Sequence, residues 1–295
     1  MSRAAVVVNP TKLDDHEAFR KSVIRAMDDR GWGEPLWQET TPEDPGRGQA
    51  EAAVSAAVDL VIACGGDGTV TACAEGVAGT GVPLALIPLG TGNLLARNVG
   101  VPLGLEEALE VALGGVQQPV DAGRVNGELF LVMAGLGLDA RMLDDTSEPL
   151  KRRLGWLAYA LTAVRHLGDR PMKVTISADG GPRRRFRASA VVVGNVGWLQ
   201  GGVPLLPDAR PDDGVLDAVV LIAGGLAGWL AVAADILLRR PAHGGTHRIR
   251  FSELTVTLKS QEPWEVDGEV VGSTRRLTVV AQPGALLLRV PPESA

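Results

Sequence analysis

The first 119 residues alternate short apolar runs with amphipathic stretches. The apolar, β-branched runs are typical of buried strands, and the amphipathic stretches have the spacing of helices. The predicted strands are 4–8, 36–40, 60–64 and 82–89, and the predicted helices are 14–30, 49–58, 69–77, 94–99 and 105–113. Because strands that alternate with helices form parallel sheets covered on both faces, the pattern predicts an α/β domain.

From residue 120 the pattern changes to strands joined by turns. The predicted strands are 120–125, 128–134, 173–178, 186–194, 216–222, 248–258, 276–281 and 286–290, with helices only at 151–167 and 226–238. This pattern favours a β-rich domain. The predicted fold class is therefore α/β, with an N-terminal Rossmann-like parallel-sheet domain over 1–119 and a β-sandwich domain over 120–295. The last strand can return to the first domain.

Composition narrows the class of protein. The 295 residues are 45% hydrophobic and 22% charged, which is typical of a globular protein of two domains. A formal charge of −6 argues against a general nucleic-acid binder. The two cysteines, Cys64 and Cys73, fit a reducing cytosol without a disulfide framework. We find no signal peptide and no spanning segment, so we expect a cytoplasmic location.

Two glycine-rich loops follow consecutive strands. The first is Gly65-Gly66-Asp67-Gly68, with Thr69 after it, and the second is Gly90-Thr91-Gly92-Asn93. Glycines let the backbone approach a phosphate, and the free amides of a first helical turn point at it. The carboxylate of Asp67 suits a metal, a water or a hydroxyl rather than the anion itself. The alternative is a pair of tight strand-to-helix turns, the second with a helix cap.

Two further polar residues end predicted strands. Asn9 follows the first strand and Thr40 ends the second. In open parallel sheets, ligands bind beyond the carboxyl ends of the strands. Four polar turns at such ends predict one phosphate-binding crevice. The chain has neither a P-loop nor a dinucleotide-binding glycine fingerprint with its acidic residue, so these two classes are disfavoured.

The order of motifs resembles one known family. The chain carries GGDGT at 65–69, preceded by Asn9-Pro10 and followed by PLGTGN at 88–93, then GGV at 201–203, PDA at 207–209, PDDGVLD at 211–217 and VDGE at 266–269. This order resembles diacylglycerol kinases and sphingosine kinases, and is closest to the bacterial soluble lipid kinases. The resemblance covers nearly the whole chain. GGDGT alone is less specific, because NAD kinases and phosphofructokinases also use it.

The resemblance implies that ATP and Mg²⁺ bind in the crevice between the domains and that the β-sandwich meets a lipid. The implied nucleotide-binding residues are Asn9, Thr40 (or its neighbour Thr41), Gly65, Gly66, Asp67, Gly68, Thr69, Thr91 and Asn93. Asp67 would act on the magnesium–phosphate side. Either Asp267 or Glu269 would be the base for the lipid hydroxyl, although Asp-Gly-Glu is also an ordinary hairpin turn.

The resemblance also implies a second metal site away from the chemistry. Its ligands would be the Asp213 carboxylate and the carbonyls of Arg210 and Val215, oxygen donors that suit magnesium or calcium. A solvated turn is the alternative. The chain departs from the family at Leu94, where many members carry an aspartate. This departure bears on which hydroxyl accepts the phosphoryl group and on the rate of catalysis.

The sequence thus predicts an ATP- and Mg²⁺-dependent lipid kinase in phospholipid biosynthesis, with diacylglycerol or a related lipid alcohol as substrate. The alternatives are an NAD or sugar-phosphate kinase with the same loop, and a nucleotide-sensing module that transfers nothing. The segments 151–159 and 226–238 are candidates for peripheral contact with the inner membrane face, or for core-facing helices. A homodimer is left open, and no nucleic-acid partner is expected.

Overall fold

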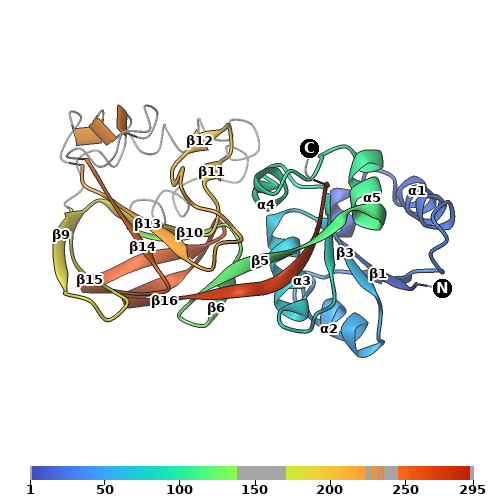
Figure 1. Cartoon of the computed structure of the whole chain (residues 1–295), viewed down its shortest axis with the longest axis horizontal. Coiled ribbons are helices and arrows are strands. Elements are labelled where there is room, and N and C mark those ends of the chain that lie inside the picture. Colours follow the sequence, from blue (N-terminus) through green and yellow to red (C-terminus); the bar gives the residue numbers. More distant parts are fainter. Residues whose placement is uncertain are drawn as a thin grey trace. The chain divides into compact units, whose positions relative to one another are not determined.

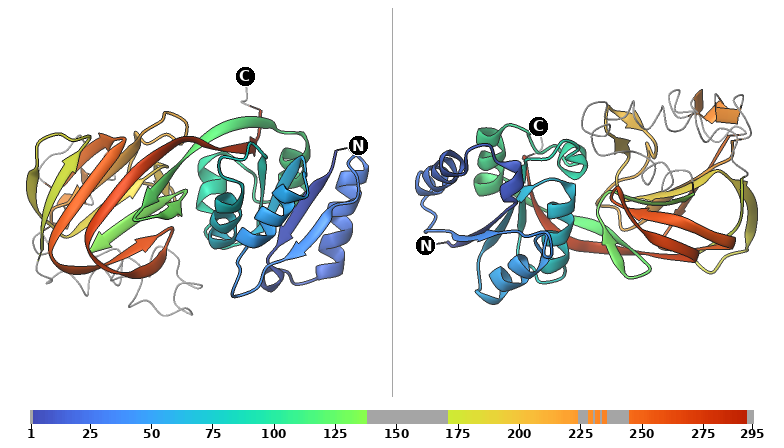
Figure 2. Two further views of the ribbon diagram at one scale, coloured as in Figure 1. Left: turned by 90° about the horizontal axis from the view of Figure 1, so that it is seen from below. Right: turned by 180° about the vertical axis from the view of Figure 1, so that it is seen from behind.

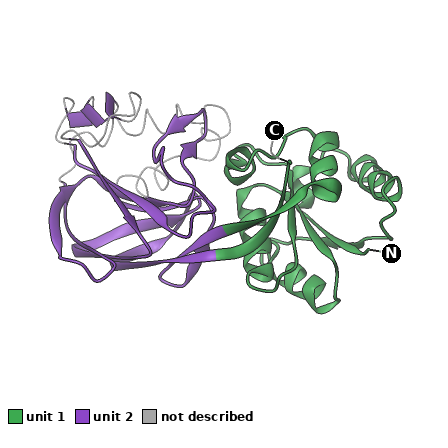
Figure 3. Cartoon of the chain, viewed as in Figure 1, with its two compact units in different colours: residues 1–120, 284–295 green, residues 121–283 purple. Residues whose placement is uncertain are grey.

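The computed structural model describes residues 2–137, 171–223, 228–229, 231–232, 234–235 and 245–292. The chain divides into two compact units, unit 1 of residues 1–120 and 284–295, and unit 2 of residues 121–283 (Figure 3). The predicted fold class is confirmed, since unit 1 is an α/β domain and unit 2 is β-rich. The helix predicted at 151–167 lies outside the described residues, and 226–238 is described only in part.

Unit 1 is built on a parallel sheet. Its strands are β1 Ala4–Val8, β2 Leu36–Glu39, β3 Leu60–Gly65 and β4 Leu84–Pro88, and its helices are α1 His16–Asp28, α2 Arg47–Ser55, α3 Asp67–Val77, α4 Leu94–Asn98 and α5 Leu105–Gly114, with a short 3₁₀ helix at Pro10–Lys12. The strand order is β2-β1-β3-β4, and all these neighbours are parallel. Leu288, near the end of the chain, pairs in parallel with Leu84 of β4.

Helices cover both faces of this sheet. α1 and α5 lie on one side and α2 and α3 on the other (Figure 1). Every residue of β1 is buried, as parallel strands between two helical layers require. α1 begins at the side-chain cap of Asp15, and it buries Phe19, Val23 and Met27 at helical spacing.

Unit 2 is antiparallel. Its strands include β6 Glu128–Phe130, β7 Met133–Gly137, β8 Met172–Ala178, β9 Arg184–Ala188, β10 Ala190–Gly194, β11 Trp198–Leu199, β12 Val203–Pro204, β13 Leu216–Leu221, β14 Thr246–Phe251 and β15 Glu253–Val266. The main path is β14-β13-β10-β7-β15-β16, and β8 pairs with β15 and β9. β5 (Val116–Val125) and β16 (Glu269–Val290) pair with each other (Figure 2), and each has residues in both units.

Several predicted strand boundaries differ from the structure. The stretch 128–134 is divided between β6 and β7, and 248–258 between β14 and β15. The stretch 186–194 is two strands, because Ser189 turns its N–H to the carbonyl of Leu221 and its hydroxyl to the carbonyl of Ala223. The predicted strands 276–281 and 286–290 are parts of the single strand β16. Pro283 and Gly284 are turn-type residues, but β16 runs through them without a break.

Candidate functional site

The carboxyl ends of four parallel strands stand side by side. Val8 at the end of β1 pairs with Cys64 of β3 and with Glu39 of β2, and backbone hydrogen bonds continue beyond these strand ends. Asn9 donates its N–H to the carbonyl of Cys64 at 2.9 Å, and Thr40 donates to the carbonyl of Val8 at 2.9 Å. The polar turns that the sequence singled out in unit 1 are thus brought to one edge of the sheet.

The side chain of Asn9 ties this edge to the start of α3. Its Nδ2 donates to Oγ1 of Thr69 at 3.3 Å, and its Oδ1 accepts from the amide and hydroxyl of Thr11 at 3.1 and 2.8 Å. Thr69 and Thr40 are both buried. α3 begins at Asp67, two residues earlier than predicted, so the last three residues of the GGDGT motif lie in the first turn of the helix.

The two glycine loops pack against each other through their backbones. A Cβ added to Gly90 would lie 2.6 Å from Cα of Gly66, and one added to Gly66 would lie 3.4 Å from Cα of Gly90. Leu89 donates its N–H to the carbonyl of Gly65 at 2.8 Å. These glycines therefore have a structural role, the close approach of two loops, beside any role in binding phosphate.

Asp67 joins the loops a second time. Its Oδ1 accepts the backbone N–H of Leu94 at 2.6 Å, and a Cβ on Gly92 would lie 2.7 Å from its Oδ2. Burial raises the pKa of the Asp67 carboxyl, and hydrogen bonds from the amides of Leu94 and its neighbours partly oppose that rise. Leu94 stands where many family members carry an aspartate. It still makes this contact, because the backbone N–H of Leu94 is the donor.

Asn93 closes the second loop on itself. Its Nδ2 donates to the carbonyl of Gly90 at 2.7 Å, and its Oδ1 accepts from the amide of Gly90 at 2.9 Å. Asn93 has a φ of 49°, a left-handed conformation that asparagine tolerates. The side chain that the sequence assigned to a nucleotide thus already shapes the loop, while Thr91 is exposed.

A glycine pair tests the packing of the loops. We expect Gly90→Ala to lower the free energy of unfolding by about 1 to 3 kcal/mol, because its methyl would collide with the backbone of Gly66. Gly114→Ala, in the last turn of α5, meets nothing within 4 Å and should be neutral or stabilising. Urea denaturation of both variants measures this, and equal stability of the two would contradict the proposed contact.

Asp267 lies in a two-residue hairpin turn, and Glu269 directly follows that turn. Val266 pairs with Glu269, and Asp267 and Gly268 both have positive φ, 45° and 88°. Positive φ at both central positions is the geometry that an Asp-Gly pair favours between antiparallel strands. The structure therefore places both candidate bases on one tight turn between β15 and β16.

The Asp267 carboxylate is anchored by backbone amides. It accepts from Leu131 at 3.0 Å, from Val132 at 2.9 Å and from Met133 at 3.0 Å. Glu269 is exposed. Both residues belong to unit 2 and Asp67 belongs to unit 1, so a shared crevice for the three stays a prediction.

Sequence reasoning missed two buried acids near these turns. Glu265, 3% exposed, accepts the N–H of Gly268 at 2.8 Å and so supports the hairpin. Asp121, also 3% exposed, accepts the N–H of Gly214 at 2.6 Å. The available signal was an acid between two apolar neighbours in a strand, since Asp121 stands between Val120 and Ala122.

The turn proposed as a second metal site is already occupied by protein groups. The Asp213 carboxylate contacts the Arg250 guanidinium and accepts the N–H of Val215 at 3.3 Å. With Arg210, these side chains line a hollow of about 450 Å³. A cation here would compete with the guanidinium for the Asp213 carboxylate, and metal binding by Arg210, Asp213 and Val215 stays a prediction. No group of three or more His, Cys, Asp or Glu among the described residues is arranged to hold a metal.

The two cysteines lie on β3 and α3, the elements that the first glycine loop connects. Cys64 and Cys73 are both free and fully buried. Burial raises the pKa of both thiols, that of Cys73 to about 12. Because the thiolate is the reactive form, we expect neither to react with a thiol reagent such as DTNB in the native protein, and both to react in urea. Rapid reaction of the native protein would contradict this burial.

Membrane contact was predicted for segments that the structure describes only in part or not at all. The stretch 151–159 lies outside the described residues, and 226–238 is described at six positions. Within the part of the chain that is described, no helix is both long and apolar enough to cross a bilayer.

Comparison with known proteins matches both units. Residues 3–125 match the diacylglycerol kinase catalytic domain, and residues 132–290 match the YegS C-terminal NAD kinase beta sandwich-like domain. The chain is 31% identical over 284 residues to diacylglycerol kinase of Bacillus subtilis, covering 92% of this chain and 91% of the relative. It is 33% identical over 276 residues to a YegS-like probable lipid kinase of Pseudomonas aeruginosa, covering 88% and 86%.

Solved structures give the same picture. A crystal structure from Bacillus anthracis str. Sterne, assigned to the diacylglycerol kinases, superposes with a TM-score of 0.83 at 25% identity and covers 100% of this chain and 97% of its own. An NAD kinase from Archaeoglobus fulgidus in complex with ATP shares the fold alone, with a TM-score of 0.52 at 15% identity, covering 97% of this chain and 93% of its own. The chain therefore belongs to the family of diacylglycerol kinases and YegS-like lipid kinases, and is an ATP-dependent kinase.

Proposed function

We propose that this kinase transfers the γ-phosphoryl group of ATP, with Mg²⁺, to the hydroxyl of diacylglycerol or a related lipid alcohol. The observation that carries the proposal is the pair of glycine loops clasped through Asp67 at the carboxyl ends of β3 and β4. These loops lie in the region that matches a diacylglycerol kinase catalytic domain. The substrate is proposed because relatives that match most of the chain carry the name diacylglycerol kinase or lipid kinase.

In this proposal the nucleotide lies over the edge of the unit 1 sheet. The backbone of Gly65, Gly66 and Gly68 and the first amides of α3 would face its phosphates, and Thr69 and Thr91 would offer hydroxyls. Asn9, Thr40 and Asn93 hold the surrounding turns in place. The buried position of Thr40 and the hydrogen bonds of Asn9 support the shaping role of these two residues.

Asp67 is the residue in unit 1 that fits a magnesium ion. Its carboxylate is a hard oxygen donor next to the proposed phosphate position, and Mg²⁺ is commonly held by one or two carboxylates together with substrate phosphates. When bound, Mg²⁺ neutralises charge on the transferring phosphoryl group. The amide of Leu94 fixes the orientation of the Asp67 carboxylate.

The hairpin of unit 2 would supply the base. Phosphoryl transfer to an alcohol needs a carboxylate that orients the hydroxyl and accepts its proton. Three backbone amides fix the Asp267 carboxylate, which gives it the stable orientation that a base needs. Glu269 is the exposed acid of the same turn and is the second candidate. A cytoplasmic location at the inner membrane face and a homodimer remain predictions.

Labelled ATP, Mg²⁺ and a mixed lipid extract test the proposal. We expect the label to appear in an organic-phase product, a phosphorylated diacylglycerol, and to be absent when EDTA removes the metal. Label in a water-soluble product would favour the NAD or sugar-phosphate kinase alternative. Saturable ATP binding with no labelled product from any lipid would favour the nucleotide-sensing alternative.

A further inference from the structure

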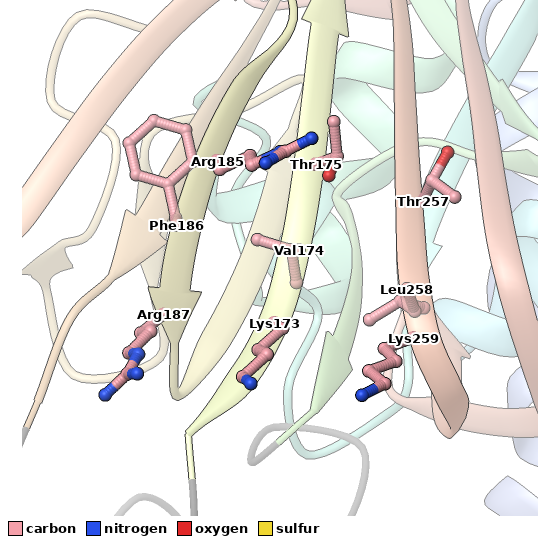
Figure 4. A pocket seen from close by; sticks show the side chains of 9 residues that line it. All are labelled: Lys173, Val174, Thr175, Arg185, Phe186, Arg187, Thr257, Leu258 and Lys259. Atoms are coloured by element: carbon pink, nitrogen blue, oxygen red, sulfur yellow. The ribbon is translucent and has the colours of Figure 1, made fainter.

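The outward face of three strands in unit 2 carries a row of cations. Lys173 on β8 pairs with Arg187 on β9. Val174 pairs with Leu258 on β15, so Lys259, the next residue, comes opposite Lys173. Figure 4 shows the charged ends of Arg187, Lys173 and Lys259 lying side by side. Three positive charges thus stand in one line across β9, β8 and β15.

A second row lies one step along the same face. Thr175 pairs with Arg185 and with Thr257, and Thr257 pairs with Arg276 on β16. We call the set Lys173, Arg185, Arg187, Lys259 and Arg276 the cationic face. All five side chains are exposed, and the hollow between the rows has a volume of about 560 Å³. The two threonines add hydroxyl donors between the charges.

The cationic face is not neutralised from within the described structure. None of its five cations forms an ion pair with another described residue, whereas Arg47 pairs with Glu51 and Glu75 in unit 1. The chain as a whole carries a formal charge of −6, so five unneutralised cations on one sheet face are a local reversal of sign. Asp179 and Glu253 lie at the far end of these strands, outside the two rows.

Folding does not require this arrangement. The alternate residues on the same strands, Val174, Val256 and Leu258, face the core of unit 2 and are buried. Like charges placed opposite each other across strands are destabilising. The cationic face therefore lowers the stability of the sheet slightly, and an external anionic partner would relieve that repulsion.

We propose that the cationic face docks on the surface of an anionic phospholipid bilayer. The proposal rests on the proposed function, because the lipid substrate lies in such a bilayer. Each Lys or Arg held near an anionic membrane strengthens binding by about fivefold. Nucleic acid fits less well, since single strands need exposed aromatic platforms and Phe186, the aromatic side chain of this hollow, is half-buried and stacked on His247.

The test measures binding of the full chain to vesicles without ATP. We expect sedimentation with vesicles of phosphatidylcholine and phosphatidylglycerol at 7:3, little with phosphatidylcholine alone, and weakening at high salt. The triple variant Lys173→Gln, Arg187→Gln, Lys259→Gln should bind the anionic vesicles on the order of 100-fold more weakly. The control variant Arg3→Gln, Lys21→Gln, Arg25→Gln changes the charge equally on exposed residues of unit 1 and should bind like the wild type.

Three results would overturn the proposal: unchanged binding by the first variant, an equal loss in the control, or tighter binding to an oligonucleotide than to the vesicles. Circular dichroism establishes that both variants are folded. Phosphorylation of a short-chain diacylglycerol in neutral detergent micelles separates the two proposals, because it needs no anionic surface. If the protein phosphorylates this lipid but does not bind anionic vesicles, the docking proposal alone is overturned. If the protein binds the vesicles, the triple variant does not, and no lipid is phosphorylated, the proposed function alone is overturned.

Discussion

Replacing Asp67 with Asn is expected to lower the rate of phosphoryl transfer by about 100-fold or more without lowering stability. The amide oxygen of Asn can still accept the N–H of Leu94, so the clasp between the loops survives. The change removes the negative charge that would hold magnesium and orient the phosphates, and loss of one such electrostatic group typically costs 10²–10³-fold in rate. Labelled-ATP assays and urea denaturation of the same preparation measure the two effects.

The pH dependence of stability sharpens this test. Because burial raises the pKa of Asp67 above its ordinary value of 3.8, the folded state binds the proton more tightly than the unfolded chain. The stabilisation that comes from protonated Asp67 is therefore fully present below pH 3.8, and it is lost as the pH rises through the raised pKa. Asp67→Asn should be at least as stable as the wild type at pH 7, and its advantage should shrink toward pH 3.8.

An exposed acid on the same unit provides the control for Asp67. Asp28→Asn, near the end of α1, removes one negative charge at a distance from the loops in sequence. It should leave the rate of phosphoryl transfer unchanged. A fully active Asp67→Asn protein, or an equal loss in Asp28→Asn, would remove Asp67 from the mechanism.

Asp267→Asn is expected to lower both activity and stability. Asn keeps the left-handed turn, which it tolerates as well as Asp does. Its amide group, however, replaces one of the two oxygens that accept from Leu131, Val132 and Met133. Loss of charged acceptors for buried amides should cost about 2 to 4 kcal/mol of unfolding free energy, and loss of the candidate base should lower the rate by about 10²–10⁴-fold.

A second turn in unit 2 separates these two effects. Asp179 also has a positive φ, precedes a glycine, and accepts backbone N–H groups, from Ser252 at 3.0 Å and Glu253 at 2.8 Å. Asp179→Asn should therefore lower stability by about 1 kcal/mol while the folded protein keeps its activity. If Asp267→Asn were destabilised yet transferred phosphate at full rate below its melting temperature, Asp267 would be an anchor and Glu269 the remaining candidate.

The elements and strand ends of unit 1 were predictable because local pattern determines them. Fully apolar runs such as β1 and β3, each followed by a polar turn, leave few alternatives in a sheet covered on both faces. The side-chain partners were not predictable in the same way. Asp67 contacts Leu94 across 27 residues, and Asp267 contacts Leu131 across 136 residues. Contacts of such sequence separation leave no periodic trace in a single sequence.

The same limit applies to residues whose role is to hold another residue. Asn93 is predicted to bind nucleotide because its amide can meet a phosphate, and the structure adds that both ends of that amide bond Gly90. Arg250 was not singled out, although it neutralises the Asp213 carboxylate. A motif identifies which residue types gather at a site, and only the three-dimensional arrangement tells which of them already have partners.

The backbone contact between Gly66 and Gly90 bears on how tightly ATP can be held. Each loop occupies the space in which the other would need a side chain, and Asp67 bridges them again. Two loops locked in this way have little freedom left to lose when a nucleotide arrives. Pre-organised sites avoid the entropic penalty of ordering mobile segments, so more of the contact energy is retained as affinity.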